Sequence, residues 1–227
     1  MTPTTVVMSW SGGKDSAMAL EALRRDPSVH VVALLTSVTN EYDRISIHGV
    51  RRALLEAQGH ALNLPIIEVE LAPVSSNEAY EAAFRTAVAR ARRQFPTLEA
   101  IAFGDLYLED VRAYRERLVA QTGLICRFPI WGIPTNQLAR QCLDEGVCAT
   151  LVCVDTTQLG GRFVGRSYDQ ALLDELPAAV DPCGEGGEFH TFVSYARGFR
   201  TPIAIAHGET VLRDARFAYL DLLPATP

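Results

Sequence analysis

Several features that mark other kinds of protein are missing from this sequence. Its 227 residues contain no run of 18 apolar residues, so we expect no membrane-spanning helix. The N-terminus has no charged segment followed by an apolar one, which argues against a secretory signal. The five cysteines form no C-x-x-C pair, and their odd number without an export signal indicates reduced thiols. We therefore expect a cytoplasmic protein with no membrane partner.

Basic residues are too few for a nucleic-acid-binding surface to be expected. Lys and Arg number 21 against 27 Asp and Glu, which gives a formal net charge of -6. This balance argues against nucleic acid as the main partner, although it leaves room for a local basic groove. Hydrophobic residues make up 48% and charged residues 21%, as in an ordinary globular protein with a substantial core.

Two common phosphate-binding motifs are also missing, although a glycine loop lies near the N-terminus. The mononucleotide P-loop fails because position 8 is Met and Lys14 is followed by Asp15. The dinucleotide fingerprint with three spaced glycines fails as well. What is present is an apolar run before Ser9, the loop Ser11-Gly12-Gly13-Lys14-Asp15-Ser16, and a helical pattern from Asp15 onward.

A strand, a glycine turn and a helix N-terminus together form an anion site. The first N–H groups of the helix have no partner within it, and they point at the loop together with the positive end of the helix dipole. Lys14 adds a full positive charge. A phosphate chain is therefore the expected ligand, and the alternative is an ordinary turn with a surface lysine.

Strands and helices alternate along the first part of the chain. After the first helix, the pattern predicts strands at 29–36, 65–71, 99–103 and 124–129, and helices at 49–62, 77–94 and 108–121. This alternation predicts an α/β fold with a doubly wound parallel sheet, in which ligands bind beyond the carboxyl ends of the strands.

The character of the sequence changes at Ile130–Pro134, where Gly and Pro mark a boundary. We expect one domain at 1–130 and a smaller α+β domain at 131–227. In the second domain the pattern predicts helices at 135–145 and 171–176, a strand at 148–154 and a hairpin at 201–213.

Two segments of the first domain carry further candidate residues. The polar loop Ser37–Ser46 follows Thr36 and is longer than a plain connection, which indicates ligand contact or a lid. His48, just before the next helix, either caps that helix or binds a ligand. Gly104-Asp105 follows a strand, where a carboxylate can bind Mg²⁺ or a ribose hydroxyl.

Arg112 and Arg115 lie one helical turn apart after this strand end. They could neutralise a phosphate or the carboxylate of a substrate. Pairing with Glu109 or Glu116 on the helix surface is the alternative for both arginines.

The segment Asp181–Val193 is the second most informative one. Pro182 stiffens it, glycines loosen it, and Glu188 and His190 share one face of the strand that follows. With Glu185, these groups could bind a metal, act as acid and base, or hold a cationic substrate; no cysteine cluster at zinc spacing supports a zinc site. A glycine-rich turn into an edge strand is the alternative.

The loop 11–16 resembles the pyrophosphate loop of the PP-loop ATPases, which cleave ATP between the α and β phosphates. With the segments 42–48, 104–116, 129–132 and 181–193 in the same order, the chain resembles the diphthine–ammonia ligase family of the adenine nucleotide alpha hydrolase-like (HUP/PP-loop) superfamily. One departure is Gly186, where the family typically carries Asn, and this bears on the identity of the substrate.

The resemblance implies an amide-forming ligase that uses ATP and Mg²⁺, releases AMP and pyrophosphate, and transfers ammonia to a carboxylate. In eukaryotes and archaea the family amidates diphthine on translation elongation factor 2. The acceptor that the resemblance implies is a carboxylate-bearing group, either a modified protein side chain such as diphthine or a small molecule. A homodimer is compatible with this resemblance.

The resemblance also implies roles for individual residues. The ATP-binding set is Ser11, Gly12, Gly13, Lys14, Asp15, Ser16, Thr36, His48, Gly104 and Asp105. The catalytic set is Lys14, Asp15, Glu185, Glu188 and His190. The acceptor-binding set is Tyr42, Arg112, Arg115, Glu185, Glu188, His190 and Thr191. Mg²⁺ would be held by Asp15 and Asp105.

Two other functions stay open at this point. A PP-loop enzyme that modifies tRNA, by thiolation or as a lysidine-type ligase, predicts a basic face and, for thiolation, paired cysteines. A non-enzymatic ATP- or AMP-binding protein of universal-stress type would not need the Asp181–Val193 segment.

Overall fold

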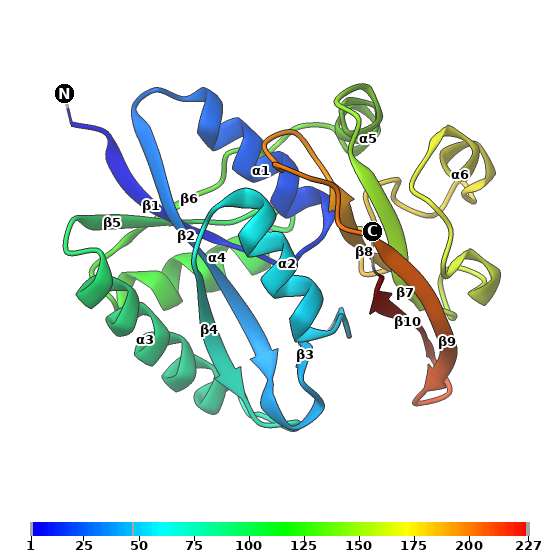
Figure 1. The fold of residues 1–227 in the computed structure, drawn as a ribbon, viewed down its shortest axis with the longest axis horizontal. Helices are drawn as coiled ribbons and strands as arrows, with labels where there is room; N and C mark the ends of the chain where they lie inside the picture. Colours follow the sequence, from blue (N-terminus) through cyan, green and yellow to red (C-terminus); the bar gives the residue numbers. More distant parts are fainter. Residues whose placement is uncertain (1, 47, 226–227) are drawn as a thin grey trace.

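A computed structural model describes residues 2–46 and 48–225 of the chain and shows two sheets side by side (Figure 1). Five strands of the first sheet run parallel in the order β4-β2-β1-β5-β6. They are β1 (Thr4–Ser9), β2 (Val29–Thr39), β4 (Ile66–Leu71), β5 (Leu98–Ala102) and β6 (Ile125–Arg127). The predicted parallel α/β fold is confirmed.

The first sheet departs from the prediction at the end of β2. Residues 37–39, expected as the start of a polar loop, continue the strand to Thr39. The reason is that Val38 is fully buried and Thr39 still pairs with Leu71 of β4. A two-residue strand, β3 (Arg44–Ile45), then pairs antiparallel with the end of β2. The short 3-10 helix η1 (Asn40–Tyr42) connects them.

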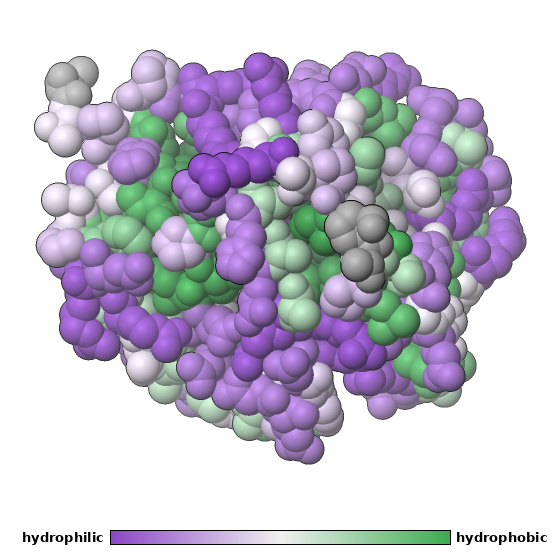
Figure 2. All heavy atoms as spheres, in the orientation of Figure 1, coloured by the Kyte–Doolittle hydropathy of each residue, from purple (hydrophilic) through white to green (hydrophobic). Residues whose placement is uncertain are grey.

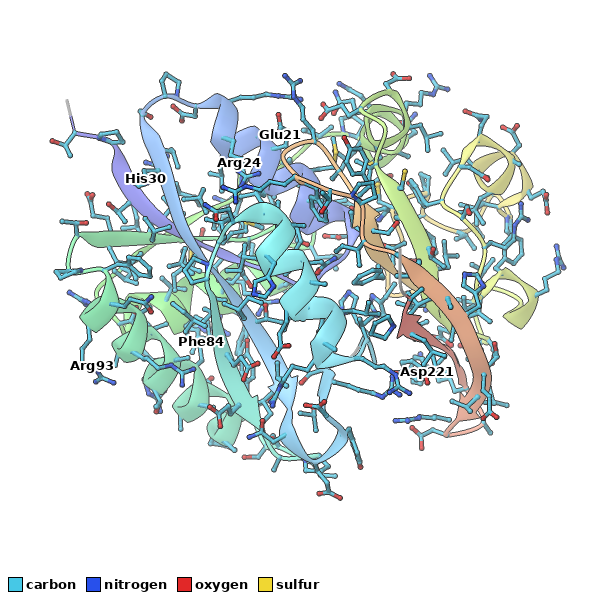
Figure 3. All side chains as sticks on the ribbon, in the orientation of Figure 1. Glu21, Arg24, His30, Phe84, Arg93 and Asp221 are labelled. Carbon is cyan, nitrogen blue, oxygen red and sulfur yellow. The ribbon has the colours of Figure 1, made fainter. Side chains whose placement is uncertain are left out.

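Helices cover both faces of the parallel sheet, as expected for a doubly wound fold. Alternate residues of β1 divide between two cores, because Val6 and Met8 pack on one face and Val7 on the other. The first core includes side chains of α1 (Lys14–Arg25) and α2 (Arg52–Leu62). The second includes those of α3 (Asn77–Gln94) and α4 (Glu109–Ala120), among them Phe84, labelled in Figure 3.

The second sheet is antiparallel in the order β8-β7-β10-β9. Its strands are β7 (Cys148–Asp155), β8 (Phe189–Tyr195), β9 (Ile205–Arg213) and β10 (Phe217–Pro224). The helices of this part are α5 (Thr135–Asp144), α6 (Gln170–Glu175) and the 3-10 helix η2 (Gly161–Phe163). A core that includes β1, α1, β7 and β8 side chains is continuous between the sheets. The domain division at 130/131 stays a prediction.

The hairpin expected within 201–213 is wrong. Residues 205–213 form the single strand β9, and the turn comes later, at Asp214 and Ala215, which both have positive φ. Gly208 does not turn the chain; instead it allows close pairing, since a Cβ there would lie 2.8 Å from the carbonyl oxygen of Asp221.

Hydrophilic side chains cover most of the face shown in Figure 2, and hydrophobic ones are visible mainly between them. None of the helices in the described part of the chain is long and apolar enough to cross a membrane.

Candidate functional site

A cavity of about 470 Å³ lies at the carboxyl ends of β1, β2 and β5, where the segment around β8 meets the first sheet. Twelve of the predicted site residues line it: Ser11, Gly13, Lys14, Asp15, Ser16, His48, Gly104, Asp105, Arg115, Glu185, His190 and Thr191. Five do not: Gly12, Thr36, Tyr42, Arg112 and Glu188. Residues from both predicted domains therefore share one cavity.

The glycine loop is shaped by two close approaches. Gly12 has φ +80, a conformation that side chains with a Cβ rarely adopt. Gly13 caps α1 without a side chain, and a Cβ there would lie 3.0 Å from the carbonyl oxygen of Thr191. Among the described residues we find no hydrogen-bond partner for the backbone N–H of Ser16, and the backbone N–H of Asp15 meets only the carboxylate of its own side chain. The N–H of Ser16 is therefore free for an anion, and that of Asp15 has no partner elsewhere in the described part of the chain.

Lys14 takes a different position from the one expected for a phosphate ligand. Its side chain is only 1% exposed, and its ammonium donates to both carboxylate oxygens of Asp15, at 3.0 and 2.9 Å, and to the carbonyl oxygen of Cys183. The rings of Tyr168 and Phe189 lie 5.4 and 5.5 Å away. Although burial opposes it, the charge of Asp15 raises the pKa of Lys14, so the amine is protonated.

Gln58, which sequence reasoning missed, joins the loop to the second sheet. Its fully buried side-chain amide donates to the carbonyl oxygens of Gly12, at 3.0 Å, and Val193, at 2.7 Å. Its oxygen accepts from the Trp10 indole at 2.8 Å. The signal was available, because Gln58 lies one turn after Leu54 on the buried face of α2.

Three carboxyl groups approach the cavity from different elements. Asp105, after β5, lies 3.7 Å from the guanidinium of Arg115, and its buried Oδ2 has no hydrogen-bond partner among the described residues. Glu185 accepts a hydrogen bond of 2.8 Å from the backbone of Leu106. Burial, with the charges of Asp15 and Asp105, raises the pKa of Glu185 to about 7. This carboxyl can therefore exchange a proton near neutral pH.

The carboxylates fit a magnesium ion that also binds phosphate. The described residues contain no group of three or more His, Cys, Asp or Glu side chains that could hold a metal by themselves. Mg²⁺, however, is usually held by one or two carboxylates together with substrate phosphates and water. Asp15 and Asp105 line the same cavity, and the unsatisfied oxygen of Asp105 is a suitable ligand.

Two imidazoles meet on the cavity wall. The rings of His48 and His190 are 4.6 Å apart between centroids. Burial, with the charge of Lys14, lowers the pKa of His190 to about 4. Burial and His190 lower the pKa of His48 well below its ordinary value, and its Nδ1 has no partner among the described residues. Both rings are therefore neutral at pH 7, and a neutral ring has one nitrogen that accepts a hydrogen bond.

The second sheet holds the loop that carries His48. Asp221 of β10, labelled in Figure 3, binds Arg44 at 2.9 Å and Arg51 at 2.6 Å. These hydrogen bonds lower the pKa of Asp221 to about 2, so it is charged at neutral pH. The same loop packs on Tyr219, which a Cβ at Gly49 would approach to 2.9 Å.

Four of the predicted residues outside the cavity have other contacts. Tyr42 is half exposed beside Arg213, and Arg112 pairs with Glu116 at 3.0 Å over the rings of Phe128 and Trp131. Glu188 is buried and accepts from the backbone of Asp181 at 3.0 Å. Thr36 is buried within β2, where its neighbours Leu35 and Ser37 line the cavity instead. Successive side chains of a strand point to opposite faces, which explains this difference.

Sequence reasoning also missed the apolar side of the cavity. Its main members are Trp10, Leu35, Leu71, Tyr80 and Phe103. Each is an ordinary hydrophobic residue of a strand end or helix, so only the folded chain distinguishes it from the core. A cavity that combines these apolar side chains with a helix N-terminus suits a ligand with an apolar part and an anionic part.

The fold and the site define a class of protein: an α/β protein with a glycine loop at the N-terminus of a helix, beside the carboxyl edge of a parallel sheet. The chain belongs to the diphthamide synthase family. The N-terminal domain of diphthamide synthase matches residues 4–126, and its C-terminal domain matches residues 134–221. The resemblance predicted from the sequence is thereby confirmed.

Individual relatives are more distant. A diphthine–ammonia ligase of Schizosaccharomyces pombe is 24% identical over 219 residues, which cover 88% of this chain. The match covers only 36% of that relative, so this chain spans about a third of its length. A crystal structure of a predicted subunit of tRNA methyltransferase from Methanocaldococcus jannaschii aligns with 85% of this chain and 98% of its own, at 16% identity and a TM-score of 0.45.

Proposed function

We propose that this protein is an ATP-dependent amide-forming ligase that releases AMP and pyrophosphate and uses ammonia as the nitrogen donor. One observation carries the proposal. Backbone N–H groups at the start of α1 and the unsatisfied carboxylate of Asp105 share a cavity with Glu185, whose pKa is raised to about 7, and with the neutral His190. An anion site, a carboxyl that can exchange a proton and a neutral imidazole thus meet in one cavity.

In the proposed reaction the phosphates of ATP lie on the loop 11–16, and the backbone N–H groups at the start of α1, that of Ser16 above all, stabilise the charge on departing pyrophosphate. Asp15 and Asp105 would hold Mg²⁺, which when bound neutralises phosphate charge. The carboxylate of the acceptor attacks the α-phosphorus, the bond to pyrophosphate breaks, and an acyl-adenylate forms. Ammonia then displaces AMP and leaves an amide.

The second half of the reaction needs a base, because ammonia is largely protonated at neutral pH. Glu185 is the best candidate, since a carboxyl with a pKa of about 7 accepts a proton and releases it again. His190 and His48 line the same cavity as neutral rings and offer hydrogen-bond acceptors there. We propose a carboxylate-bearing acceptor, either diphthine on a protein or a small molecule. Glu188, Arg112 and Tyr42 are not needed for this mechanism.

The test measures AMP and pyrophosphate after incubation with ATP, Mg²⁺ and ammonium, with and without elongation factor 2 carrying diphthine or small carboxylates. We expect AMP formation that requires both acceptor and ammonium. Without ammonium, the acceptor should still support exchange of labelled pyrophosphate into ATP. Asp105→Asn should lower both signals about 100-fold, since it weakens electrostatic stabilisation of the transferring group. Arg112→Ala is the matched control, because Arg112 lies outside the cavity.

The same assay separates the alternatives. ATP binding without AMP formation under any of these conditions would contradict the ligase and favour a non-enzymatic nucleotide-binding protein. AMP formation that depends on added tRNA, and not on a carboxylate, would favour a tRNA-modifying enzyme.

A further inference from the structure

Lys14 is the one side chain of the glycine loop whose charge is turned away from solvent. Its side chain is 1% exposed, and an ammonium has three N–H donors. In the structure its three contacts are the two carboxylate oxygens of Asp15 and the carbonyl oxygen of Cys183. Its hydrogen-bonding capacity is therefore used within the protein, and the N–H groups of the loop remain for a phosphate.

These contacts join the two sides of the cavity. Cys183 lies two residues before Glu185, so the ammonium holds the backbone next to the proposed base. The backbone N–H of Lys14 also donates to the hydroxyl of Thr191 at 3.1 Å, and Thr191 directly follows His190 in the sequence. One residue of the phosphate loop thus contacts the 181–191 segment near both Glu185 and His190.

The pairing partner of Lys14 faces the ligand. The Asp15 side chain is 28% exposed and lines the cavity, while the ammonium behind it is enclosed by the rings of Tyr168 and Phe189. An anion or a cation that contacts Asp15 changes how strongly this carboxylate attracts Lys14. In a buried environment such a change is only weakly screened by water, so it reaches the Cys183 carbonyl.

We propose that Lys14 is a positioning residue that couples occupancy of the phosphate loop to the geometry of the 181–191 segment. The coupling runs from a ligand to Asp15, then to Lys14, and through the carbonyl of Cys183 to Glu185. The identity of the ligand as Mg²⁺–ATP rests on the proposed function, whereas the connection from Lys14 to Cys183 does not.

The experiment is amide hydrogen exchange on the whole chain, with and without Mg²⁺–ATP, for wild type and Lys14→Met. Without ligand, the variant should show about tenfold faster exchange in 181–188, because a hydrogen bond from a charged donor is lost. Mg²⁺–ATP should change exchange in this segment of the wild type but not of the variant. The nucleotide Kd should change less than about fivefold, a shift of about 1 kcal/mol.

Tyr168→Phe is the matched control. The Tyr168 hydroxyl donates to the carbonyl oxygen of Pro182 at 2.7 Å, so its removal loosens the same segment without removing the ammonium of Lys14. This variant should exchange faster but keep the response to Mg²⁺–ATP. If Lys14→Met does not fold, as judged by circular dichroism, Lys14→Gln replaces it and the same results are expected.

Two results would overturn the proposal. If exchange in 181–188 of the Lys14 variant equals that of wild type without ligand, the contact from Lys14 to Cys183 does not hold this segment. If the variant also loses much of its nucleotide affinity, Lys14 is a phosphate ligand instead. An unaltered response of 181–191 to nucleotide in the variant would remove the coupling. If wild type binds no nucleotide, both the proposed function and the coupling fail. The comparison of wild type and variant without ligand still tests whether Lys14 holds the segment through Cys183.

Discussion

The two sides of the cavity are built in different ways. The glycine loop is formed by neighbouring residues, since the end of a strand, two glycines and the first N–H groups of a helix all lie within residues 9–16. The 181–191 segment is placed by distant residues: Leu106 binds Glu185, Tyr168 binds Pro182, and Lys14 binds Cys183. The proposed anion site is thus built mainly from one stretch of chain, whereas the groups proposed to act on the substrate are placed by contacts with distant residues.

The two sides also differ in charge. The loop offers the positive end of the α1 dipole, whereas the 181–191 segment offers a carboxyl of raised pKa and a neutral imidazole. An anion is bound best in positive surroundings, whereas negative surroundings help a group to accept a proton. The loop and the 181–191 segment, which come from different sheets, bring these two kinds of surroundings to one cavity. The predictions below test whether the two sides are as distinct, and as closely joined, as this comparison implies.

The largest effect is expected where the two sides are joined. Gln58→Leu removes three buried hydrogen bonds, to Trp10, Gly12 and Val193, and leaves the Trp10 indole N–H without this partner, while the Gly12 carbonyl keeps the N–H of Val193 at 2.8 Å. We expect the free energy of unfolding to fall by about 3 kcal/mol or more in urea denaturation. Gln137→Leu, at an exposed position of α5, is the control and should stay within about 0.5 kcal/mol. An equal effect of both variants would contradict the role of Gln58.

The comparison also explains what could be predicted from the sequence. The glycine loop, the parallel sheet and the position of Asp105 follow from local patterns, because turn chemistry and hydrophobic periodicity are properties of neighbouring residues. Gln58 and the apolar wall were missed because their neighbours lie on other elements. The sequence predicted Lys14 as a phosphate ligand because the contact of its ammonium with the Cys183 carbonyl is visible only in the folded chain.

Other differences have equally simple causes. Sequence spacing places Arg112 and Arg115 on neighbouring positions of α4, but cannot tell which of them faces the cavity. Thr36, expected at a strand end, lies within β2, and the alternation of this strand turns its neighbours Leu35 and Ser37 to the cavity instead. The motif 181–193 contains Glu185 and Glu188 three residues apart, and only Glu185 lines the cavity. A motif thus indicates a site without identifying every residue that contacts the ligand.

The next effect tests the proton-accepting side. The pKa of Glu185 is raised by burial from 4.5 to about 7, so the folded state holds its proton more strongly than the unfolded state. Stability from this group is complete below pH 4.5 and is lost as pH rises through 7. Glu185→Gln should therefore stabilise the protein relative to wild type at pH 8 but not at pH 4.5, in urea denaturation at the two values. Its ligase turnover should fall about 100-fold.

A contrary result for Glu185 is easy to recognise. Equal stability differences at both pH values would mean that the carboxyl has an ordinary pKa in the folded state. Asp144→Asn, at the end of α5 and away from the cavity, is the control for a carboxylate outside the site.

The pKa of His190 should give an effect on stability of the opposite sign to that of Glu185. The pKa of His190 is lowered by burial and by Lys14 to about 4, so the unfolded state takes up a proton first as pH falls. Stability from this group is present above pH 6.5 and is lost as pH falls towards 4. Thermal unfolding of His190→Gln should therefore depend less on pH between 6.5 and 4 than that of wild type. An identical dependence would mean that His190 is not buried as a neutral ring.

The smallest effect is expected for Arg112, and it sharpens the contrast with Arg115. Arg112 contacts Glu116 and the ring of Trp131 outside the cavity, so Arg112→Ala should cost about 1 kcal/mol of stability or less and leave AMP formation unchanged. Arg115→Ala removes the cation beside Asp105, whose Oδ2 is already unsatisfied. This variant should slow AMP formation about tenfold by weakening charge stabilisation at the phosphates. Equal activities of the two variants would show that the cavity does not use the face of α4 that carries Arg115.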